Sequence, residues 1–174
     1  MLIILDRDGV INFDSVDYVK SPDEWIPIPG SIEAIAQLSK AGNTIVIATN
    51  QSGVNRGLFS LKTLEKIHEK LIRAVESFGG KITKIYFCPH APDENCHCRK
   101  PKPGMLQQIQ KDFTVKNTEM IYVGDSVKDF EVAQAVGCKF ILVRTGNGKK
   151  TEKQLTKIKL PVFENLLAVT QHFA

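Results

Sequence analysis

The sequence predicts an α/β protein built on a doubly wound parallel sheet. Short apolar runs rich in β-branched residues alternate along the chain with segments in which apolar residues recur at helical spacing. Such alternation is typical of a parallel sheet with helices on both faces. The chain has 174 residues, which suits one domain with one sizeable core, and it shows no internal repeat and no linker. Residues 1–174 are therefore expected to form a single domain.

Five strands are expected, each at a short apolar run with β-branched residues near its centre. The lengths of these runs are those of strands buried inside a sheet. The expected strands are Leu2–Leu5, Thr44–Thr49, Ile82–Phe87, Met120–Val123 and Lys139–Val143.

Four helices are expected between the strands. Ser31 and Ser60 are expected to cap the first two, because a serine at that position accepts a backbone N–H. Gly42 and Gly79 are expected to end them, since glycine adopts the conformation that closes a helix. The other two helices are expected over residues 104–113 and 127–136.

Two long segments do not fit this alternation. Residues 7–30 contain three prolines, and residues 88–103 contain three of the four cysteines. Loops of this length inside a compact domain are usually functional. A functional site is therefore expected where these two loops meet the ends of the strands.

Charge and hydropathy argue against two classes of partner. The net charge is +4, and the densest basic stretch, Lys149 to Lys159, is expected to be a solvated surface and not a nucleic-acid interface. No apolar run approaches the length of a membrane span, and Met1–Asp6 is charged too soon for a signal peptide. We expect a cytoplasmic monomer with no nucleic-acid or membrane partner, in which cysteines are thiols or metal ligands and not disulfides.

Carboxylates follow two of the expected strands. Asp6 and Asp8 come directly after the first strand, where alternate residues face the same way, and a divalent cation or a shared proton would relieve their repulsion. Asp125 and Asp129 follow the fourth strand and can complete an oxygen-rich shell suited to magnesium. A single aspartate at such a junction is more often a turn former or a helix cap. Asp6, Asp8 and Asp125 together, in two motifs that each follow a buried strand, favour a functional site.

Two further segments suit phosphate binding. Thr49-Asn50-Gln51-Ser52-Gly53 follows the second strand and offers hydroxyl, amide and backbone donors for phosphate oxygens, although a polar turn that caps a helix would look the same. Lys100 lies between Arg99 and Pro101 before an expected helix. It could reach the site and offset phosphate charge, or it could belong to an exposed basic loop.

A cluster of soft ligands lies in the second long loop. Cys88, His90, Cys96 and Cys98 form a Cys₃His set suited to a tetrahedral, structural zinc. The alternatives are a loop of free thiols, which would be reactive, and a strained Cys96–Cys98 disulfide. Zinc bound here would fix the position of Arg99 and the lysine that follows it.

The remaining cysteine and two histidines are interpreted as structural. Cys138 is expected to be a buried small residue before the last strand. His68 and His172 lie in helical stretches and are expected at the surface.

Taken in chain order, the motifs resemble those of the haloacid dehalogenase superfamily of phosphohydrolases. The resemblance implies a Rossmann-like fold, and the length leaves little room for a separate cap domain. It implies that Asp6 is the nucleophile of a covalent phospho-aspartate mechanism and that Asp8 serves first as acid and then as base. Thr49 and Lys100 would hold the phosphoryl group.

The same resemblance implies a magnesium site. Asp125 would bind Mg²⁺ together with Asp6 and the backbone carbonyl of Asp8, and Asp129 would support that shell. A carboxylate is a poor nucleophile towards a phosphate anion until charge is neutralised, and Mg²⁺ and Lys100 would do this.

A narrower resemblance is to the heptose bisphosphate phosphatase branch of the superfamily, with the histidinol phosphatases as a sister group. It rests on Leu5–Gly9, Thr49–Gly53, Cys88–His90 and Cys96–Pro101. It implies a phosphorylated sugar substrate: removal of the C7 phosphate of D-glycero-D-manno-heptose 1,7-bisphosphate, on the route to nucleotide-activated heptose for lipopolysaccharide. It also agrees with zinc in the cysteine loop. The alternatives are a histidinol-phosphate phosphatase and a non-catalytic, zinc-ordered binding module.

Substrate contacts are expected from three segments. The first is the loop after Asp6, where Asp17 stands in the place of a glycine usual in the family, and the others are the end of the second strand and the Arg99-Lys100 pair. Outside these segments, Ser126 stands where some members carry a lysine. The expected substrate-binding residues are Asp14, Ser15, Val16, Asp17, Asn50, Gln51, Ser52, Arg99 and Lys100.

Overall fold

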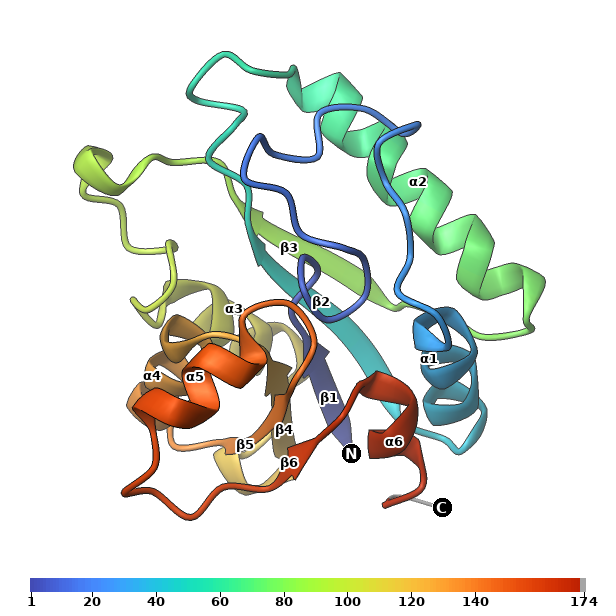
Figure 1. Cartoon of the computed structure of the whole chain (residues 1–174), viewed down its shortest axis with the longest axis vertical. Helices are drawn as coiled ribbons and strands as arrows, with labels where there is room; N and C mark the ends of the chain where they lie inside the picture. Colours follow the sequence, from blue (N-terminus) through green and yellow to red (C-terminus); the bar gives the residue numbers. More distant parts are fainter. Residues whose placement is uncertain (173–174) are drawn as a thin grey trace.

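The computed structural model describes residues 1–172, and in this part of the chain six strands form one parallel sheet in the order β3-β2-β1-β4-β5-β6 (Figure 1). The strands are β1 (Leu2–Leu5), β2 (Thr44–Asn50), β3 (Lys84–Cys88), β4 (Met120–Gly124), β5 (Lys139–Val143) and β6 (Val162–Phe163). The helices are α1 (Ser31–Lys40), α2 (Leu61–Ser77), α3 (Gly104–Phe113), α4 (Val127–Val136), α5 (Gly148–Gln154) and α6 (Leu166–Thr170). Short 3₁₀ turns lie at Pro92–Glu94 and Asn117–Glu119.

The sheet divides the core into two layers, because successive strand residues point to opposite faces. In β1, Ile3 and Leu5 pack on the side covered by α1, α2 and α6, whereas Leu2 and Ile4 pack on the side covered by α3 and α4. Both faces are therefore buried, as a parallel sheet requires. The predicted doubly wound α/β fold is confirmed.

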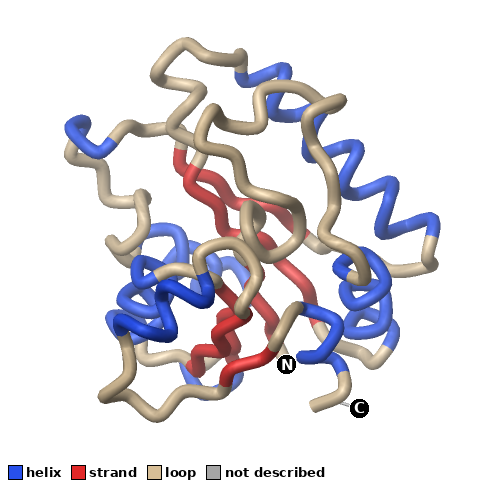
Figure 2. Tube along the Cα trace, viewed as in Figure 1, coloured by secondary structure: helices blue, strands red, loops and turns tan. Residues whose placement is uncertain are grey.

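The strand order reverses between β1 and β4. From β1 the chain proceeds outward through β2 and β3, and it then returns to pair β4 with β1 on the other side, with Leu5 opposite Val123. Such a switch point leaves a crevice beyond the carboxyl ends of the two central strands, where ligands bind in open α/β sheets. The long loops 7–30 and 88–103 lie beyond these ends (Figure 2).

The predicted helices agree closely with the structure, except for one cap. The expected helices over 104–113 and 127–136 match α3 and α4, and the Ser60 hydroxyl caps α2 by accepting the N–H of Thr63 at 3.0 Å. The Ser31 cap was wrong: Gly30 occupies that position, and the Ser31 hydroxyl donates to the carbonyl of Ile11 at 2.6 Å. The long-range contact uses the hydroxyl that a local cap would have needed.

The remaining differences concern short or polar elements. The strand predicted over Ile82–Phe87 begins only at Lys84, and β6, α5 and α6 had not been predicted. β6 has two residues and α5 reads GKKTEKQ, so neither carries the apolar periodicity by which an element is recognised. None of the described helices is long and apolar enough to span a membrane.

Candidate active site

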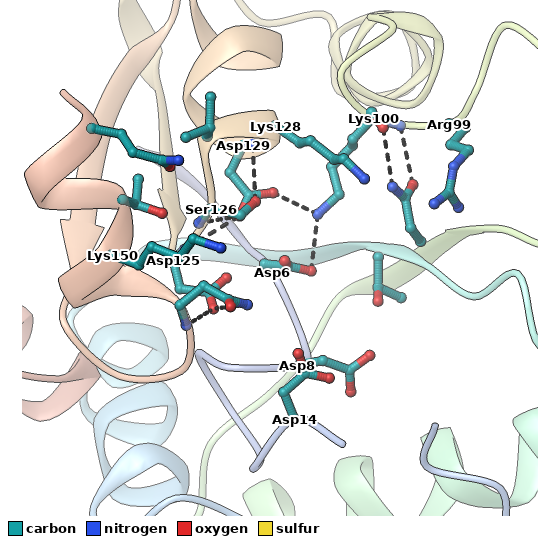
Figure 3. Close-up of a pocket in the computed structure, with 16 residues that line it drawn as sticks. Asp6, Asp8, Asp14, Arg99, Lys100, Asp125, Ser126, Lys128, Asp129 and Lys150 are labelled. Carbon is teal, nitrogen blue, oxygen red and sulfur yellow. Dashed lines mark hydrogen bonds and ion pairs between the residues drawn. The ribbon is translucent and has the colours of Figure 1, made fainter. Parts of the chain in front are cut away.

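A cavity of about 480 Å³ opens at the carboxyl ends of β1, β2 and β4. Figure 3 shows its walls, which come from the ends of these strands, the loop 88–103, the turn before α4, and α5. The cavity lies at the switch point of the sheet, and its lining is rich in charged side chains. The lining residues are Asp6, Asp8, Asp14, Thr49, Asn50, Arg99, Lys100, Asp125, Ser126, Val127, Lys128, Asp129, Asn147, Lys150, Thr151 and Gln154.

Lys100 is a buried cation aimed at the nucleophile candidate. Its Nζ lies 2.9 Å from Oδ1 of Asp6, 2.7 Å from Oδ1 of Asp129 and 2.7 Å from the hydroxyl of Tyr122. Burial alone would lower the pKa of Lys100, but the carboxylates of Asp129 and Asp6 outweigh it and raise that pKa. The alternative of an exposed basic loop is therefore wrong, and Lys100 is a fixed positive charge in the site.

The backbone of Lys100 is held by a side chain from the neighbouring strand. The Asn50 amide accepts the Lys100 N–H at 3.0 Å and donates to the Lys100 carbonyl at 3.2 Å. Thr49, one residue earlier, is buried and lines the cavity. The end of β2 thus positions the lysine as well as offering a hydroxyl to a ligand.

Three carboxylates converge beside this lysine. Asp6, Asp125 and Asp129 each place an oxygen within 4.8 Å of the others. Burial and the charge of Asp129 raise the pKa of Asp6 well above its ordinary value and that of Asp125 to about 7. A cation bound among them would reverse this penalty, and carboxylate oxygens are the ligands that Mg²⁺ prefers. The donor set fits magnesium.

The three carboxylates differ in how many hydrogen bonds their oxygens already accept. Asp129 accepts Lys100 and the Tyr122 hydroxyl on Oδ1 and the backbone N–H groups of Asp125 and Ser126 on Oδ2. Burial tends to raise the pKa of Asp129, but Lys100 and the hydroxyls of Ser126 and Tyr122 lower it. Asp129 is therefore ionised and occupied, which suits a supporting role. Asp6 and Asp125 retain an oxygen that could meet a metal or a substrate.

A glycine makes room for this arrangement. Gly9 has φ +83°, and a Cβ there would collide with the carboxylate of Asp125. The turn after Asp8 therefore packs its backbone directly against the second acidic motif.

Asp8 is held by four side-chain donors. The Arg7 guanidinium reaches Oδ1 from Nε at 3.0 Å and from Nη2 at 2.9 Å, and Asn12 and Gln51 donate at 2.9 and 2.8 Å. Burial would raise the pKa of Asp8, but Arg7 and the amide donors lower it. The side chain of Asp8 lies outside the cluster of three carboxylates. Its charge is balanced by Arg7, a partner that sequence reasoning missed, and not by a shared proton with Asp6.

The other residues expected to bind substrate do not all reach the cavity. Asp14 lines the cavity, and Ser15 and Val16 line a neighbouring cavity of about 380 Å³ that also includes Asp14. Asp17 is exposed and lines neither cavity, so its carboxylate is not directed at the site. Gln51 and Ser52 are buried behind the wall, where Gln51 donates to Asp8 and Thr49.

One wall of the cavity had not been expected. Lys150 belongs to the basic stretch interpreted as plain solvated surface, yet it lines the cavity with Lys128, Asn147 and Gln154. Within residues 1–172, neither lysine ammonium has an ion-pair or hydrogen-bond partner. The sequence pattern did not indicate this position, because α5 lacks the apolar stripe by which a helix packed near the site would have been predicted.

The four predicted zinc ligands meet at one point. The Sγ of Cys88 lies 2.8 Å from that of Cys98 and 3.6 Å from that of Cys96, and Nδ1 of His90 lies 3.2 Å from Cys98. All four cysteines are free thiols, and hydrogen bonds lower the pKa of Cys96 to about 7 in spite of burial. Three sulfurs and one imidazole nitrogen in this arrangement fit a tetrahedral zinc.

Two interpretations of isolated residues need correction. His68 is buried, with 8% of its surface exposed, and its Nε2 lies 3.3 Å from Nη1 of Arg7. Burial and Arg7 lower its pKa to about 3. Cys138 is only partly buried and lines a separate cavity near the start of β5. His172 is exposed, as expected.

Comparison with known proteins places these features in a family. A family model described as HAD-hydrolase-like matches residues 97–169. A D-glycero-beta-D-manno-heptose-1,7-bisphosphate 7-phosphatase from Pseudomonas aeruginosa is 52% identical over 168 residues, covering 97% of this chain and 94% of the relative. A protein of the same name from Neisseria meningitidis is 50% identical over 175 residues, covering 98% and 93%.

A solved structure shows the same architecture. The D,D-heptose 1,7-bisphosphate phosphatase from B. bronchiseptica, complexed with magnesium and phosphate, superposes with a TM-score of 0.93 at 50% identity. The superposition covers 99% of this chain and 97% of that one.

Proposed function

The chain belongs to the haloacid dehalogenase-like family of heptose bisphosphate phosphatases, and from this premise we propose that it removes the C7 phosphate of D-glycero-D-manno-heptose 1,7-bisphosphate in a magnesium-dependent reaction. The product would feed the synthesis of nucleotide-activated heptose for lipopolysaccharide. The names of the relatives support the β anomer as substrate. The observation that carries the proposal is the Asp6–Lys100 pair, set among buried carboxylates at the switch point of a parallel sheet.

We assign the nucleophile to Asp6. Its Oδ1 accepts the Arg7 N–H at 2.7 Å and lies 2.9 Å from Lys100, so the carboxylate is oriented with Oδ2 left for attack. Attack on phosphorus forms an acyl phosphate on Asp6 and breaks the bond between phosphorus and the C7 oxygen. Magnesium, held by Asp6, Asp125 and the carbonyl of Asp8, would neutralise charge on the phosphoryl group.

Asp8 is assigned the proton transfers. In the free protein it is ionised, because Arg7 and two amides lower its pKa. A substrate phosphate beside it adds negative charge and favours protonation. Asp8 can then give that proton to the departing C7 oxygen. In the second step it takes a proton from the water that attacks the acyl phosphate, which releases inorganic phosphate and restores Asp6.

The cations around the cavity suit a substrate with two phosphates. We assign Lys100 and the Thr49 hydroxyl to hold the phosphoryl group that is transferred, because both line the cavity and Lys100 contacts Asp6. Arg99 lines the same cavity and can offer a bidentate fork to the second phosphate. Lys128, which lies beside Lys100, and Lys150, on the opposite side of the cavity, supply further positive charge.

We assign a structural zinc to the cysteine loop. Four protein ligands leave no open position, so the metal would order the loop and take no part in the reaction. Because three of the ligands must be reduced thiols, a reducing compartment suits the protein, and we propose that it acts in the cytoplasm. We also propose that it acts as a monomer, which sedimentation in solution would test.

Side-by-side turnover assays test the function. We expect rapid release of one phosphate from the β anomer of heptose 1,7-bisphosphate with Mg²⁺, slower release from the α anomer, and little from histidinol phosphate. Faster turnover of histidinol phosphate would assign the protein to the sister activity. Failure to hydrolyse any of these, or an aryl phosphate, with Mg²⁺ present would support a non-catalytic binding module.

A further inference from the structure

The guanidinium of Arg7 is a buried connector between the acid–base residue and a helix. Arg7 has no exposed surface, and its Nε and Nη2 atoms form a fork on the carboxylate of Asp8 at 2.9 to 3.2 Å. A fork of this kind fixes the plane and the direction of a carboxylate as well as its charge. The orientation of Asp8 therefore depends on how Arg7 itself is held.

The third nitrogen of the guanidinium points away from Asp8. Nη1 lies 3.3 Å from Nε2 of His68, which is on α2, 61 positions along the chain. Arginine only donates hydrogen bonds, so Nε2 of His68 must carry a lone pair and the imidazole must be neutral. The low pKa of His68 agrees with this state.

His68 is itself fixed by its surroundings. Its ring packs against Phe87 of β3, with ring centroids 6.0 Å apart, and it lies on the same buried face of α2 as Leu64 and Leu71. The side chain is buried, and it is not among the residues that line the active-site cavity. The hydrogen-bonded connection from His68 to the acid–base residue runs through Arg7.

We propose that His68 is a positioning residue for proton transfer: by accepting a hydrogen bond from Nη1 it sets the rotation of the Arg7 guanidinium, and through it the direction in which Asp8 presents its carboxyl group. This inference rests on the proposed function, because it gives Asp8 the proton transfers. A neutral acceptor is needed at this place, since a carboxylate would compete with Asp8 for the fork and an apolar side chain would leave a buried N–H of a charged group without a partner.

The test uses the dependence of the rate on the leaving group. An alkoxide is a poor leaving group that needs the proton from Asp8, whereas 4-nitrophenolate leaves without one. The quantity kcat/KM reports the steps up to release of the leaving group, so it excludes the later role of Asp8 as base. We compare kcat/KM for heptose 1,7-bisphosphate and for 4-nitrophenyl phosphate in the intact wild-type protein and in variants of His68.

We expect His68→Leu to lower kcat/KM for the sugar phosphate by about tenfold or more, a part of the roughly 100-fold or greater factor that general acid catalysis supplies. The value for 4-nitrophenyl phosphate should change little. His68→Gln, whose amide oxygen can accept the hydrogen bond, should restore most of the loss. His68→Asn, whose amide is too short to reach Arg7, should behave as His68→Leu and serves if the leucine variant does not fold.

Leu71→Val is the matched control, because Leu71 is fully buried on the same helix. It should lower the melting temperature and leave the ratio of the two kcat/KM values unchanged. Equal losses on both substrates in the His68 variants, no loss on either, or a glutamine variant no better than asparagine would overturn the positioning role. Failure of the wild-type protein to hydrolyse either substrate would instead overturn the proposed function, and the inference with it.

Discussion

Nη1 of Arg99 donates a hydrogen bond of 3.3 Å to the backbone carbonyl of His90, so a side chain that lines the active-site cavity is tied directly to one of the four candidate zinc ligands. Within the same loop, the ammonium of Lys102 donates to the carbonyl of Cys96, a second candidate zinc ligand, at 2.8 Å. The loop that holds the candidate zinc ligands is therefore hydrogen-bonded to a side chain of the cavity wall. Loss of a metal from this loop is therefore expected to alter substrate binding through Arg99.

We predict one tightly bound zinc per chain. Removal of zinc should release residues 89–103 and leave the sheet folded, because Cys88 at the end of β3 is the only one of the four ligands that belongs to a strand. Both kcat and KM should worsen as Arg99 and Lys100 lose their placement. Thiolate ligands favour zinc and carboxylates favour magnesium, so the two metals should not compete. Elemental analysis of protein purified without a chelator, together with circular dichroism and kinetics, measures these effects.

Two cysteine variants supply the comparison for zinc. Cys96→Ser should mimic the zinc-free protein, whereas Cys138→Ser should keep full metal content because Cys138 is remote from the cluster. Absence of zinc in the wild-type protein, or equal zinc in the wild-type and Cys96→Ser proteins, would show that the loop is not a zinc site.

Arg99 is predicted to discriminate between substrates. Arg99→Ala should lower kcat/KM for the bisphosphate by about tenfold or more, since a charged hydrogen bond is worth roughly 1.5 to 3 kcal/mol, and should affect a heptose monophosphate much less. Lys149→Ala is a control for the loss of one positive charge, because Lys149 is exposed and, unlike Lys150 beside it, does not line the cavity. Zinc content is measured alongside, to exclude an indirect effect through His90. Equal losses on both substrates would remove the case for a second-phosphate contact.

Asp6→Asn is predicted to abolish turnover while the fold persists. An amide cannot form the acyl phosphate, and the substitution also removes a buried charge, so thermal stability should not fall greatly. The wild-type protein, quenched in acid during turnover, should carry a labile phosphate that the variant lacks. Near-normal activity of Asp6→Asn with Mg²⁺ present would disprove the covalent mechanism.

The stability of the magnesium-free protein should depend on pH through Asp125. Burial and Asp129 raise its pKa from 3.8 to about 7, so the folded state keeps a proton that the unfolded state loses. The contribution of Asp125 to the free energy of unfolding is fully present below about pH 4 and is lost as the pH rises through about 7. The loss is about 1.4 kcal/mol for each pH unit between the two pKa values. Added Mg²⁺ competes with this proton, so the affinity of the protein for Mg²⁺ should increase as the pH rises over the same interval.

Thermal unfolding across this pH range, in magnesium-free buffer and with Mg²⁺, measures both effects. Asp125→Asn cannot ionise, so it should lose the Asp125 component of the pH dependence and most of the stabilisation by Mg²⁺. A stabilisation by Mg²⁺ that is the same at low and neutral pH would contradict the assignment of Asp125 as a ligand.

Much of the site could be predicted because its residues sit at positions fixed by a simple rule. Asp6 and Asp125 each follow a buried apolar strand, and parallel strands end at the same edge of a sheet, so their meeting followed from the sequence pattern. The four candidate zinc ligands lie within eleven consecutive residues, Cys88 to Cys98, and soft ligands so close together have few other uses. Local spacing and residue chemistry were sufficient in both cases.

Tertiary packing decided what local patterns could not express. His68 reads as a polar residue of an amphipathic helix, and only the docking of α2 places it against Arg7. In the sequence Lys150 is one of several lysines in a basic stretch, and only the position of α5 in the fold brings it to the cavity. The sequence by itself determined strands β1 to β5 and the candidate metal ligands that follow them, because these depend on neighbours along the chain. The partners of Asp8 and the far wall of the cavity depend on contacts between distant segments, and such contacts form only when the core packs.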